Sequence, residues 1–198
     1  MPFLIQDGQL PATFTAGPMT DDDFAALCAN HPDLSFEMTA EGEIIIMAPA
    51  YSFTAARNAR ITIRLGIWAD QDGRGITFDS SAGFVLPNGA RRSPDACWLL
   101  TSRFAPEDRK GFMHLCPDFV IELRSDTDRL NPLQRKLQEY LANGAQLGWL
   151  LDPETESVEM YRPDGNMERI AGTTRVEGEG PVAGFVLELA RVWNPLGK

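Results

Sequence analysis

The stretch CPDFVIELRSDTDRLNPLQRKLQEY, residues 116–140, has the pattern of a buried strand, a polar turn and an amphipathic helix. Alternation along the strand sends Phe119, Ile121 and Leu123 to one face and Glu122 to the other. A carboxylate in the middle of an apolar strand is costly unless its charge is paired or holds a metal ion. Glu122 is therefore the first candidate site residue.

The predicted helix follows the Glu122 strand directly. Asn131 is placed to cap this helix, and Pro132 suits its first turn. At about 100° per residue, the buried stripe of the helix consists of Leu133, Leu137 and Leu141. Lys136 and Tyr140 border that stripe on one side. Lys136 could therefore reach over the sheet towards Glu122.

The composition of the chain is that of a globular protein. It has 198 residues, of which 43% are hydrophobic and 23% are charged. We expect an N-terminal extension over residues 1–19 and a single domain over residues 20–198. There is no apolar run of membrane-spanning length, and we expect no secretion signal. Three scattered cysteines suit a reducing cytoplasm and argue against a structural zinc site.

The rest of the sequence predicts strands and helices in mixed order. Thr20 and Asp23 resemble a capping box before a short helix that runs to about Ala29. Hairpins are predicted for LSFEMT with EIIIMA, for the strands on either side of PNG, and for SVEMYR with NMERIA. The runs RSPDACWLL and LGWLLD predict further strands. The segment PVAGFVLELARVW predicts one more strand or helix.

The longest predicted helix, residues 52–71, has two apolar stripes where a surface helix normally has one. One stripe consists of Ala56, Ala59, Ile63 and Ile67, and the other of Ile61, Leu65 and Trp68. Arg57, Arg60 and Arg64 lie between them, where they would line a crevice. We expect the sheet to cover one stripe. The other would be covered by a second layer of this chain, such as the N-terminal segment, or by the partner in a homodimer.

The most informative constellation is Asp95, Glu122 and Lys136. Asp95 lies in a second β-like run, so the two carboxylates converge if the strands are neighbours and the residues share a face. Converging carboxylates repel unless a cation lies between them or one takes up a proton. Mg²⁺ prefers such oxygen ligands, and a nearby lysine can orient water or offset charge in a transition state.

The same residues also have structural interpretations. Asp95 could bind backbone amides near a turn, Glu122 could pair with a buried arginine, and Lys136 could pack its aliphatic stem. Tyr140 fits a core position with its hydroxyl at the rim.

The net charge of −10 argues against a broad basic surface for nucleic acid, although a local patch is compatible with it. Arg91 and Arg92 come just before the Asp95 run. With Arg57 and Arg60 they could form the local positive patch that a phosphodiester needs. Internal salt bridges are the equal alternative for these arginines.

Five sequence blocks together resemble the Uma-two family of restriction-endonuclease-like proteins, which belongs to the PD-(D/E)XK nuclease superfamily. The blocks are GFVLPNGARRSPDACW, CPDFVIELRSDTDRL, KLQEY, NGAQLGWLLDP and VEMYRP. The resemblance implies an α+β (α/β) fold with a restriction-endonuclease-like mixed β-sheet flanked by helices. It also implies that Asp95 and Glu122 are metal ligands, together with the carbonyl of Leu123.

The sequence departs from the family and superfamily patterns in two places. The superfamily lysine usually stands two residues after the second carboxylate, where this chain has Arg124. The resemblance instead places the lysine at Lys136. We expect Arg124 to point to the same side as Glu122, where it could pair with it when no metal is bound. Many relatives carry a histidine on the long helix, where this chain has none. Either Arg57 or Asn58 would replace it, or the site would be weakened.

Two functions follow as expectations. The first is an endonuclease that hydrolyses DNA phosphodiester bonds with Mg²⁺ or Mn²⁺, with Asp95 and Glu122 as ligands and Lys136 orienting the attacking water. The second is a catalytically weak or inactive nuclease-fold protein that serves in binding or regulation. Its support is the acidic net charge and the missing helix histidine.

Overall fold

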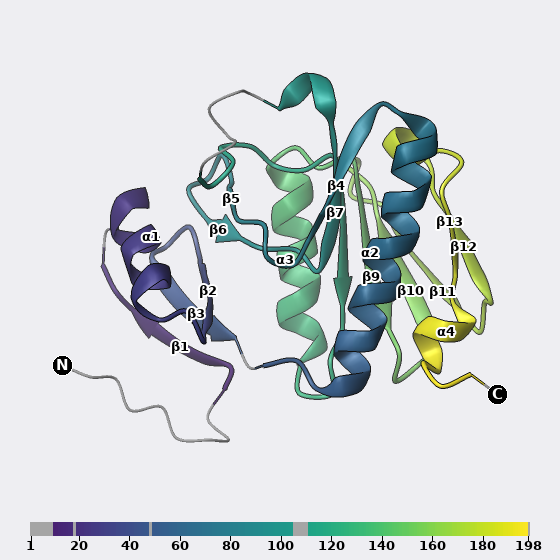
Figure 1. The fold of residues 1–198 in the computed structure, drawn as a ribbon, viewed down its shortest axis with the longest axis horizontal. Helices are drawn as coiled ribbons and strands as arrows, with labels where there is room; N and C mark the ends of the chain where they lie inside the picture. The colour runs from purple at the N-terminus through teal and green to yellow at the C-terminus, as the bar shows by residue number, and fades with distance from the viewer. Residues whose placement is uncertain (1–9, 18, 48, 105–110, 198) are drawn as a thin grey trace.

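The computed structural model describes residues 10–17, 19–47, 49–104 and 111–197 (Figure 1). The first elements are β1 (Ala12–Thr15), α1 (Asp21–Asn30), β2 (Ser35–Met38), β3 (Glu43–Met47), α2 (Ser52–Asp72), β4 (Gly75–Asp79), β5 (Phe84–Val85) and β6 (Arg91–Arg92). They are followed by β7 (Ala96–Leu100), η1 (Thr101–Arg103), β8 (Phe119–Leu123), α3 (Leu130–Ala142), β9 (Leu147–Asp152), β10 (Ser157–Tyr161), β11 (Met167–Ala171), β12 (Arg175–Glu177), η3 (Gly180–Val182), β13 (Val186–Glu188) and α4 (Ala190–Trp193).

The centre of the molecule is a six-stranded sheet in the order β11-β10-β9-β8-β7-β4. It is mixed, because β8 pairs antiparallel with β7 and parallel with β9. A five-stranded sheet, in the order β1-β3-β2-β6-β5, forms the N-terminal layer, whose strand β5 joins the core under α3, and β12 pairs with β13. The predicted mixed sheet flanked by helices is confirmed. Within the described residues, no helix is both long and apolar enough to cross a membrane.

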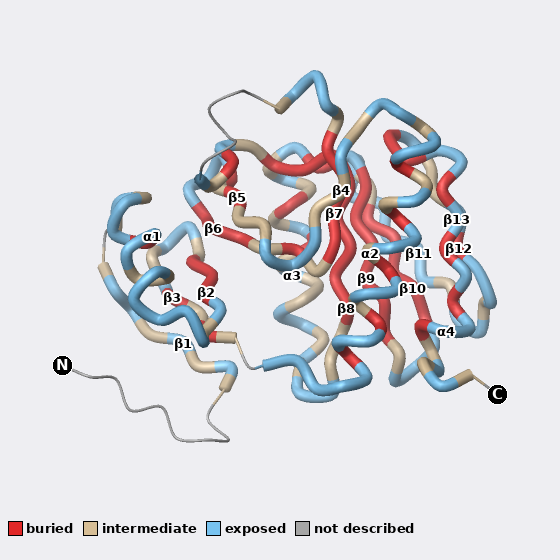
Figure 2. Tube along the Cα trace, viewed as in Figure 1, coloured by how far each residue is buried: buried red, intermediate tan, exposed pale blue. Residues whose placement is uncertain are grey.

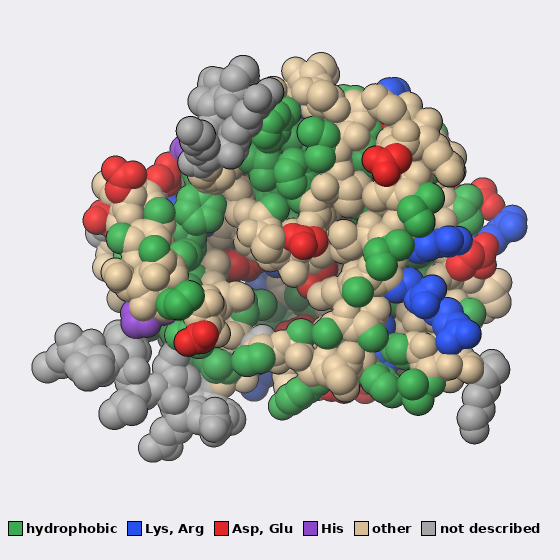
Figure 3. Space-filling view, in the orientation of Figure 1, with side chains coloured by type: hydrophobic (Ala, Val, Ile, Leu, Met, Phe, Trp, Pro, Cys, Tyr) green, Lys and Arg blue, Asp and Glu red, His purple; other side chains and the backbone are tan. Residues whose placement is uncertain are grey.

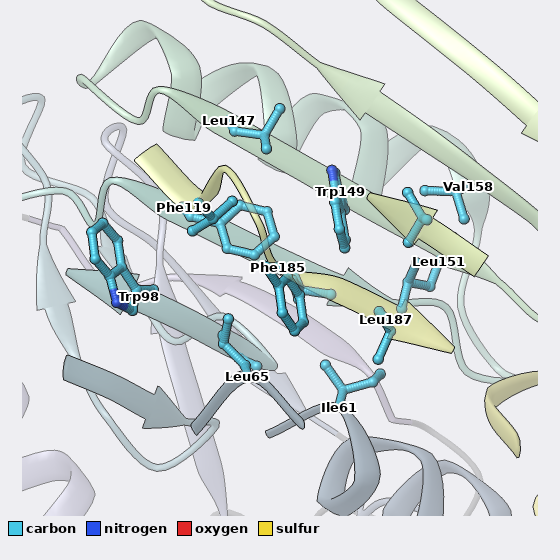
Figure 4. Close-up of a cluster of buried hydrophobic side chains, with 14 of the residues drawn as sticks. Ile61, Leu65, Trp98, Phe119, Leu147, Trp149, Leu151, Val158, Phe185 and Leu187 are labelled. Carbon is cyan, nitrogen blue, oxygen red and sulfur yellow. The ribbon is translucent and has the colours of Figure 1, made fainter. Parts of the chain in front are cut away.

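The two faces of the central sheet carry separate cores, and its middle strands are buried on both (Figure 2). On the α2 face, Ile61 and Leu65 pack with Phe119, Trp149 and Phe185 (Figure 4). On the α3 face, apolar side chains of β7, β8 and β9 pack with Leu137 and Tyr140. The alternation predicted for β8 fits this division, which places Glu122 on the α3 face.

The structure of α2 differs from the expectation that both of its apolar stripes are covered. Ile61 and Leu65 are fully buried, and Trp68 packs its ring against those of Trp98 and Phe185. The C-terminal segment supplies this cover together with the sheet, and no described residue of the N-terminal segment belongs to this cluster. The other stripe faces outwards, with Ile63 59% exposed. Because the stripe of Ile61, Leu65 and Trp68 is covered within the chain, it gives no reason to require a homodimer.

Helix α3 begins earlier than its capping pattern predicts. Its N-cap is Arg129, which makes no side-chain capping bond, so the prediction of Asn131 as the cap is wrong. Pro132 still falls in the first turn, where the backbone N–H groups have no partner within the helix and a missing donor costs little.

The N-terminal layer follows its predicted elements. Thr20 and Asp23 form the predicted capping box of α1. The predicted hairpin is present as β2 and β3, which pair antiparallel. Part of the predicted extension is a strand, since β1 pairs with β3. Residues 1–9 of that extension lie outside the described residues.

Candidate active site

The pairing of β7 with β8 brings the two predicted carboxylates together. Ala96 lies opposite Ile121, and the same register continued by one residue places Asp95 opposite Glu122. Asp95 Oδ2 accepts a hydrogen bond from the N–H of Leu123 at 2.8 Å. The two strands are neighbours, as the convergence of these side chains requires.

Lys136 reaches this end of the sheet from α3. Its Nζ lies 2.8 Å from Glu122 Oε1 and also 2.8 Å from Glu37 Oε1. The ammonium also donates to the carbonyl of Ser93 at 3.4 Å. Its side chain is 10% exposed, so it lies at the bottom of the site and not on an open surface. The prediction that Lys136 extends over the sheet towards Glu122 agrees with this ion pair.

Glu37 is the residue that sequence reasoning missed. It lies on β2 and is 3% exposed. Its carboxylate accepts the N–H of Ser93 at 3.0 Å and pairs with Arg92 at 3.2 Å. The signal was present in LSFEMT, where a glutamate stands in an apolar strand just as Glu122 does. Glu37 and Glu122 therefore hold Lys136 from two different sheets.

Asn58 completes the surroundings of Asp95. Its amide on α2 donates to Asp95 Oδ1 at 2.8 Å. Arg57, the other residue expected to replace the absent histidine, does not contact Asp95. It is buried and donates to the carbonyls of Val192 and Trp193. Of the two, only Asn58 contacts the candidate site.

The carboxylates of the site differ in how readily they ionise. Burial, with added repulsion from Asp95 and Glu37, outweighs Lys136 and raises the pKa of Glu122 to about 8. Burial also raises the pKa of Asp95, with partial compensation from its bond to Leu123 and from Lys136. For Glu37, burial opposes ionisation, but Lys136 and Arg92 outweigh it and lower the pKa.

Lys136 shows the complementary effect. Burial disfavours its charged form, but Glu122 and Glu37 outweigh burial and raise its pKa. One ammonium thus serves two carboxylates, and Glu37 benefits from Arg92 as well. Glu122 has the weaker compensation, which is why its proton is held more firmly. Binding of a further cation beside Glu122 would favour the ionised form of its carboxyl group.

A hard divalent cation suits this set of donors. No group of three or more His, Cys, Asp or Glu side chains arranged for a metal ion occurs in the described ranges. An ion here would therefore rest on Asp95 and Glu122, with Leu123 and water as further oxygen sources. Mg²⁺ is commonly bound in this way, through one or two carboxylates plus waters and a substrate phosphate. The residues present fit such an ion.

The four arginines proposed as one positive patch do not form one. Arg57 is buried under the C-terminal segment, and Arg60 is exposed on α2. Arg91 is buried, pairs with Asp21 and lies over the ring of Phe24. Arg92 alone lines the candidate site, where it pairs with Glu37 and with Glu139 at 2.6 Å. For Arg91 and Arg92 the alternative of internal salt bridges is the observed one.

Arg124 and Tyr140 also lie differently from the expectation. Arg124 pairs with Asp152 at 3.1 Å and with Glu154 at 2.5 Å, so its predicted pairing with Glu122 is wrong. Tyr140 is fully buried in the core beneath α3, with its ring 5.9 Å from Lys136 Nζ. Its hydroxyl has no hydrogen-bond partner among the described residues and is not at a rim.

The candidate site opens into a cleft of about 970 Å³. The cleft lies between the five-stranded sheet and α3, and Figure 3 shows the surface hollowed beside the N-terminal layer. Glu37, Asp95, Glu122 and Lys136 all line it. A substrate that enters the cleft would therefore meet all four side chains.

The chain is similar to a solved structure and to a known protein family. The fold matches the crystal structure of a "putative nuclease belonging to DUF820" from Anabaena variabilis, with a TM-score of 0.74 and 21% identity. The match covers 89% of this chain and 98% of that chain. No curated protein matches. The family model described as "Putative restriction endonuclease" matches residues 21–190. The chain therefore belongs to the Uma2 family, and its resemblance to that family is confirmed.

Proposed function

We propose that this protein is a divalent-metal-dependent endonuclease that hydrolyses DNA phosphodiester bonds, with Mg²⁺ as the ion and Mn²⁺ as a substitute. The observation that carries this proposal is the meeting of Asp95, Glu122 and Lys136 in one cleft, with Lys136 Nζ 2.8 Å from Glu122. Membership of the Uma2 family supports the same class of reaction.

In the proposed mechanism, Asp95 and Glu122 would hold the ion, with the carbonyl of Leu123 as a further ligand. When bound, the ion would polarise the scissile phosphate and lower the pKa of a water molecule. Asn58 fixes one oxygen of Asp95 and the Leu123 N–H fixes the other, so the carboxylate has a defined orientation. Such preorganisation avoids reorganisation during the reaction.

Lys136 is proposed to orient the attacking water and to offset charge that develops on the phosphate. Glu37 would act as a positioning residue for Lys136. Its carboxylate is fixed by Ser93 and Arg92 and contacts the ammonium at 2.8 Å. Substrate entry would then require Lys136 to exchange its contact with Glu122 for one to water or phosphate, while Glu37 keeps it in place.

Cleavage of supercoiled plasmid DNA and of single-stranded circular DNA over a range of Mg²⁺ concentrations tests this proposal. Wild-type protein should cut at least one of the two DNA forms, and only with added ion. Asp95→Asn and Lys136→Met should abolish the product. Asp70→Asn, which changes an exposed carboxylate of α2 outside the cleft lining, should cleave like wild type. Equal cleavage by wild type and Asp95→Asn would refute the assignment.

Specific observations also support a second function, that of a nuclease-fold protein that binds or regulates without efficient cleavage. Lys136 is already paired with two carboxylates, Arg124 is tied to Asp152 and Glu154, and the chain carries a net charge of −10. Wild-type protein that binds Mg²⁺ and DNA, yet leaves both plasmid and single-stranded DNA intact under all conditions, would favour this function.

A further inference from the structure

The cleft has two walls of opposite character. The five-stranded sheet presents Glu41 and Glu43, both exposed and without an ion pair to any described residue. The start of α3 presents Arg129 and Arg135, also exposed and without such a pair in the described chain, beside one partly exposed carboxylate, Asp128, so this wall is positive on balance. A phosphate backbone in the cleft is therefore attracted to one wall and repelled by the other.

An exposed aromatic side chain also lines the cleft. Tyr51, the N-cap residue of α2, lines the cleft and is 64% exposed. Ile45 and Met47 of β3 lie nearby on the sheet wall and are partly exposed. Proteins that bind single strands combine a positive track for the backbone with aromatic platforms on which bases stack. The cleft offers both features on different sides.

We infer that the cleft accepts a single strand of DNA, with its phosphates along Arg129 and Arg135 and its bases towards Tyr51. This inference rests on the proposed function and names the form of the substrate.

An intact duplex fits the cleft poorly. It carries two backbones and about one charge per 1.7 Å of its axis, so its second backbone would meet Glu41 and Glu43.

Fluorescence anisotropy with one labelled sequence, as a single strand and as a duplex, tests the inference. The Asp95→Asn protein is used in Mg²⁺ buffer so that the strand is not cut. It should bind the single strand more tightly than the duplex. Each of Arg129→Gln and Arg135→Gln should reduce the slope of log affinity against log salt by about 0.7. Arg60→Gln, an exposed arginine outside the cleft lining, should leave the slope unchanged.

Two further variants separate stacking from charge. Tyr51→Ala should weaken single-strand binding about tenfold, the loss expected for one base stack, whereas Tyr51→Phe should retain it. The double variant Glu41→Gln/Glu43→Gln should improve duplex binding more than single-strand binding, because it removes the repulsive wall.

The outcomes distinguish the inference from the proposed function. Duplex binding as tight as single-strand binding, or Arg129→Gln and Arg135→Gln behaving like Arg60→Gln, would overturn the inference. Metal-dependent cleavage of plasmid by wild type would stand in that case. If wild type neither binds nor cuts either form, both are overturned.

Discussion

The two faces of the central sheet are both buried, but their side chains differ in character. On the α2 face, Trp149 stacks on Phe185 with ring centroids 5.7 Å apart, and the cluster around them is apolar. On the α3 face, an apolar core extends only part of the way along the sheet. It ends at Glu122, Glu37 and Lys136, whose side chains are also nearly inaccessible.

The difference shows where the fold gains and loses free energy. Burying apolar surface stabilises by about 25 cal/mol per Å², whereas burying charges costs free energy even when they are paired. A protein selected for stability alone would continue the apolar core beneath α3. The charged end of that face therefore indicates a functional demand, and the following changes test the contrast.

The largest effect is expected on the apolar face. Trp149→Ala should lower the free energy of unfolding by about 3–5 kcal/mol, because it removes a fully buried aromatic ring and leaves a cavity. Urea denaturation measures this loss, which should be the same at acid and alkaline pH. A loss below about 1 kcal/mol would mean that this core is not tightly packed.

Lys136→Met tests the charged end of the α3 face. Removing the ammonium leaves Glu37 and Glu122 buried with less compensation, so we expect a loss of about 3 kcal/mol at mildly alkaline pH. In acid the carboxylates take up protons, and the loss should shrink. Urea denaturation at several pH values measures both the loss at alkaline pH and its decrease in acid. A loss as insensitive to pH as that of Trp149→Ala would contradict the account.

Glu122→Gln tests the raised pKa of Glu122 in metal-free buffer. Because this pKa is about 8 in the fold and ordinary in the unfolded chain, the proton on Glu122 stabilises the fold. This contribution is complete below the unfolded pKa of about 4.3 and is lost as pH rises through about 8. At about pH 9 the variant should exceed wild type by on the order of 1 kcal/mol.

Glu37→Gln is the matched control, since the pKa of Glu37 is lowered and the sign reverses. Its cost should be present at neutral pH and disappear as pH falls through the folded pKa. If both variants shift the pH profile in the same direction, the two carboxylates do not share Lys136 as described.

The smallest effect is expected at Tyr140. Its buried hydroxyl has no partner among the described residues, so Tyr140→Phe removes an uncompensated polar group. The variant should be unchanged or up to about 1 kcal/mol more stable. Thermal denaturation is sufficient to measure this. A clear loss of stability would reveal a hydrogen bond to a bound water.

The sequence predicted the part of the site that depends on local pattern. Strand alternation placed Glu122 on the α3 face, and helical periodicity placed Lys136 beside the buried stripe of α3. Glu37 was missed because its place depends on how the N-terminal sheet packs beside α3, which no local period encodes. Its apolar neighbours in β2 were the available clue.

Helix α2 illustrates a second limit. Periodicity identified two apolar stripes, but it does not show which stripe the chain itself covers. Ile63 and Ile67 are the ones left exposed, and the C-terminal segment occupies the position considered for a partner. The homodimer stays a prediction that sedimentation would test.

The most direct test of the central claim is the stabilisation of the protein by Mg²⁺. An ion that binds only the folded state at a hundred times its dissociation constant adds about 2.7 kcal/mol to the free energy of unfolding. Wild type and Asp70→Asn should show this gain equally in urea denaturation with and without Mg²⁺, and Asp95→Asn should lose it. An equal gain in Asp95→Asn would place the ion elsewhere and contradict the account.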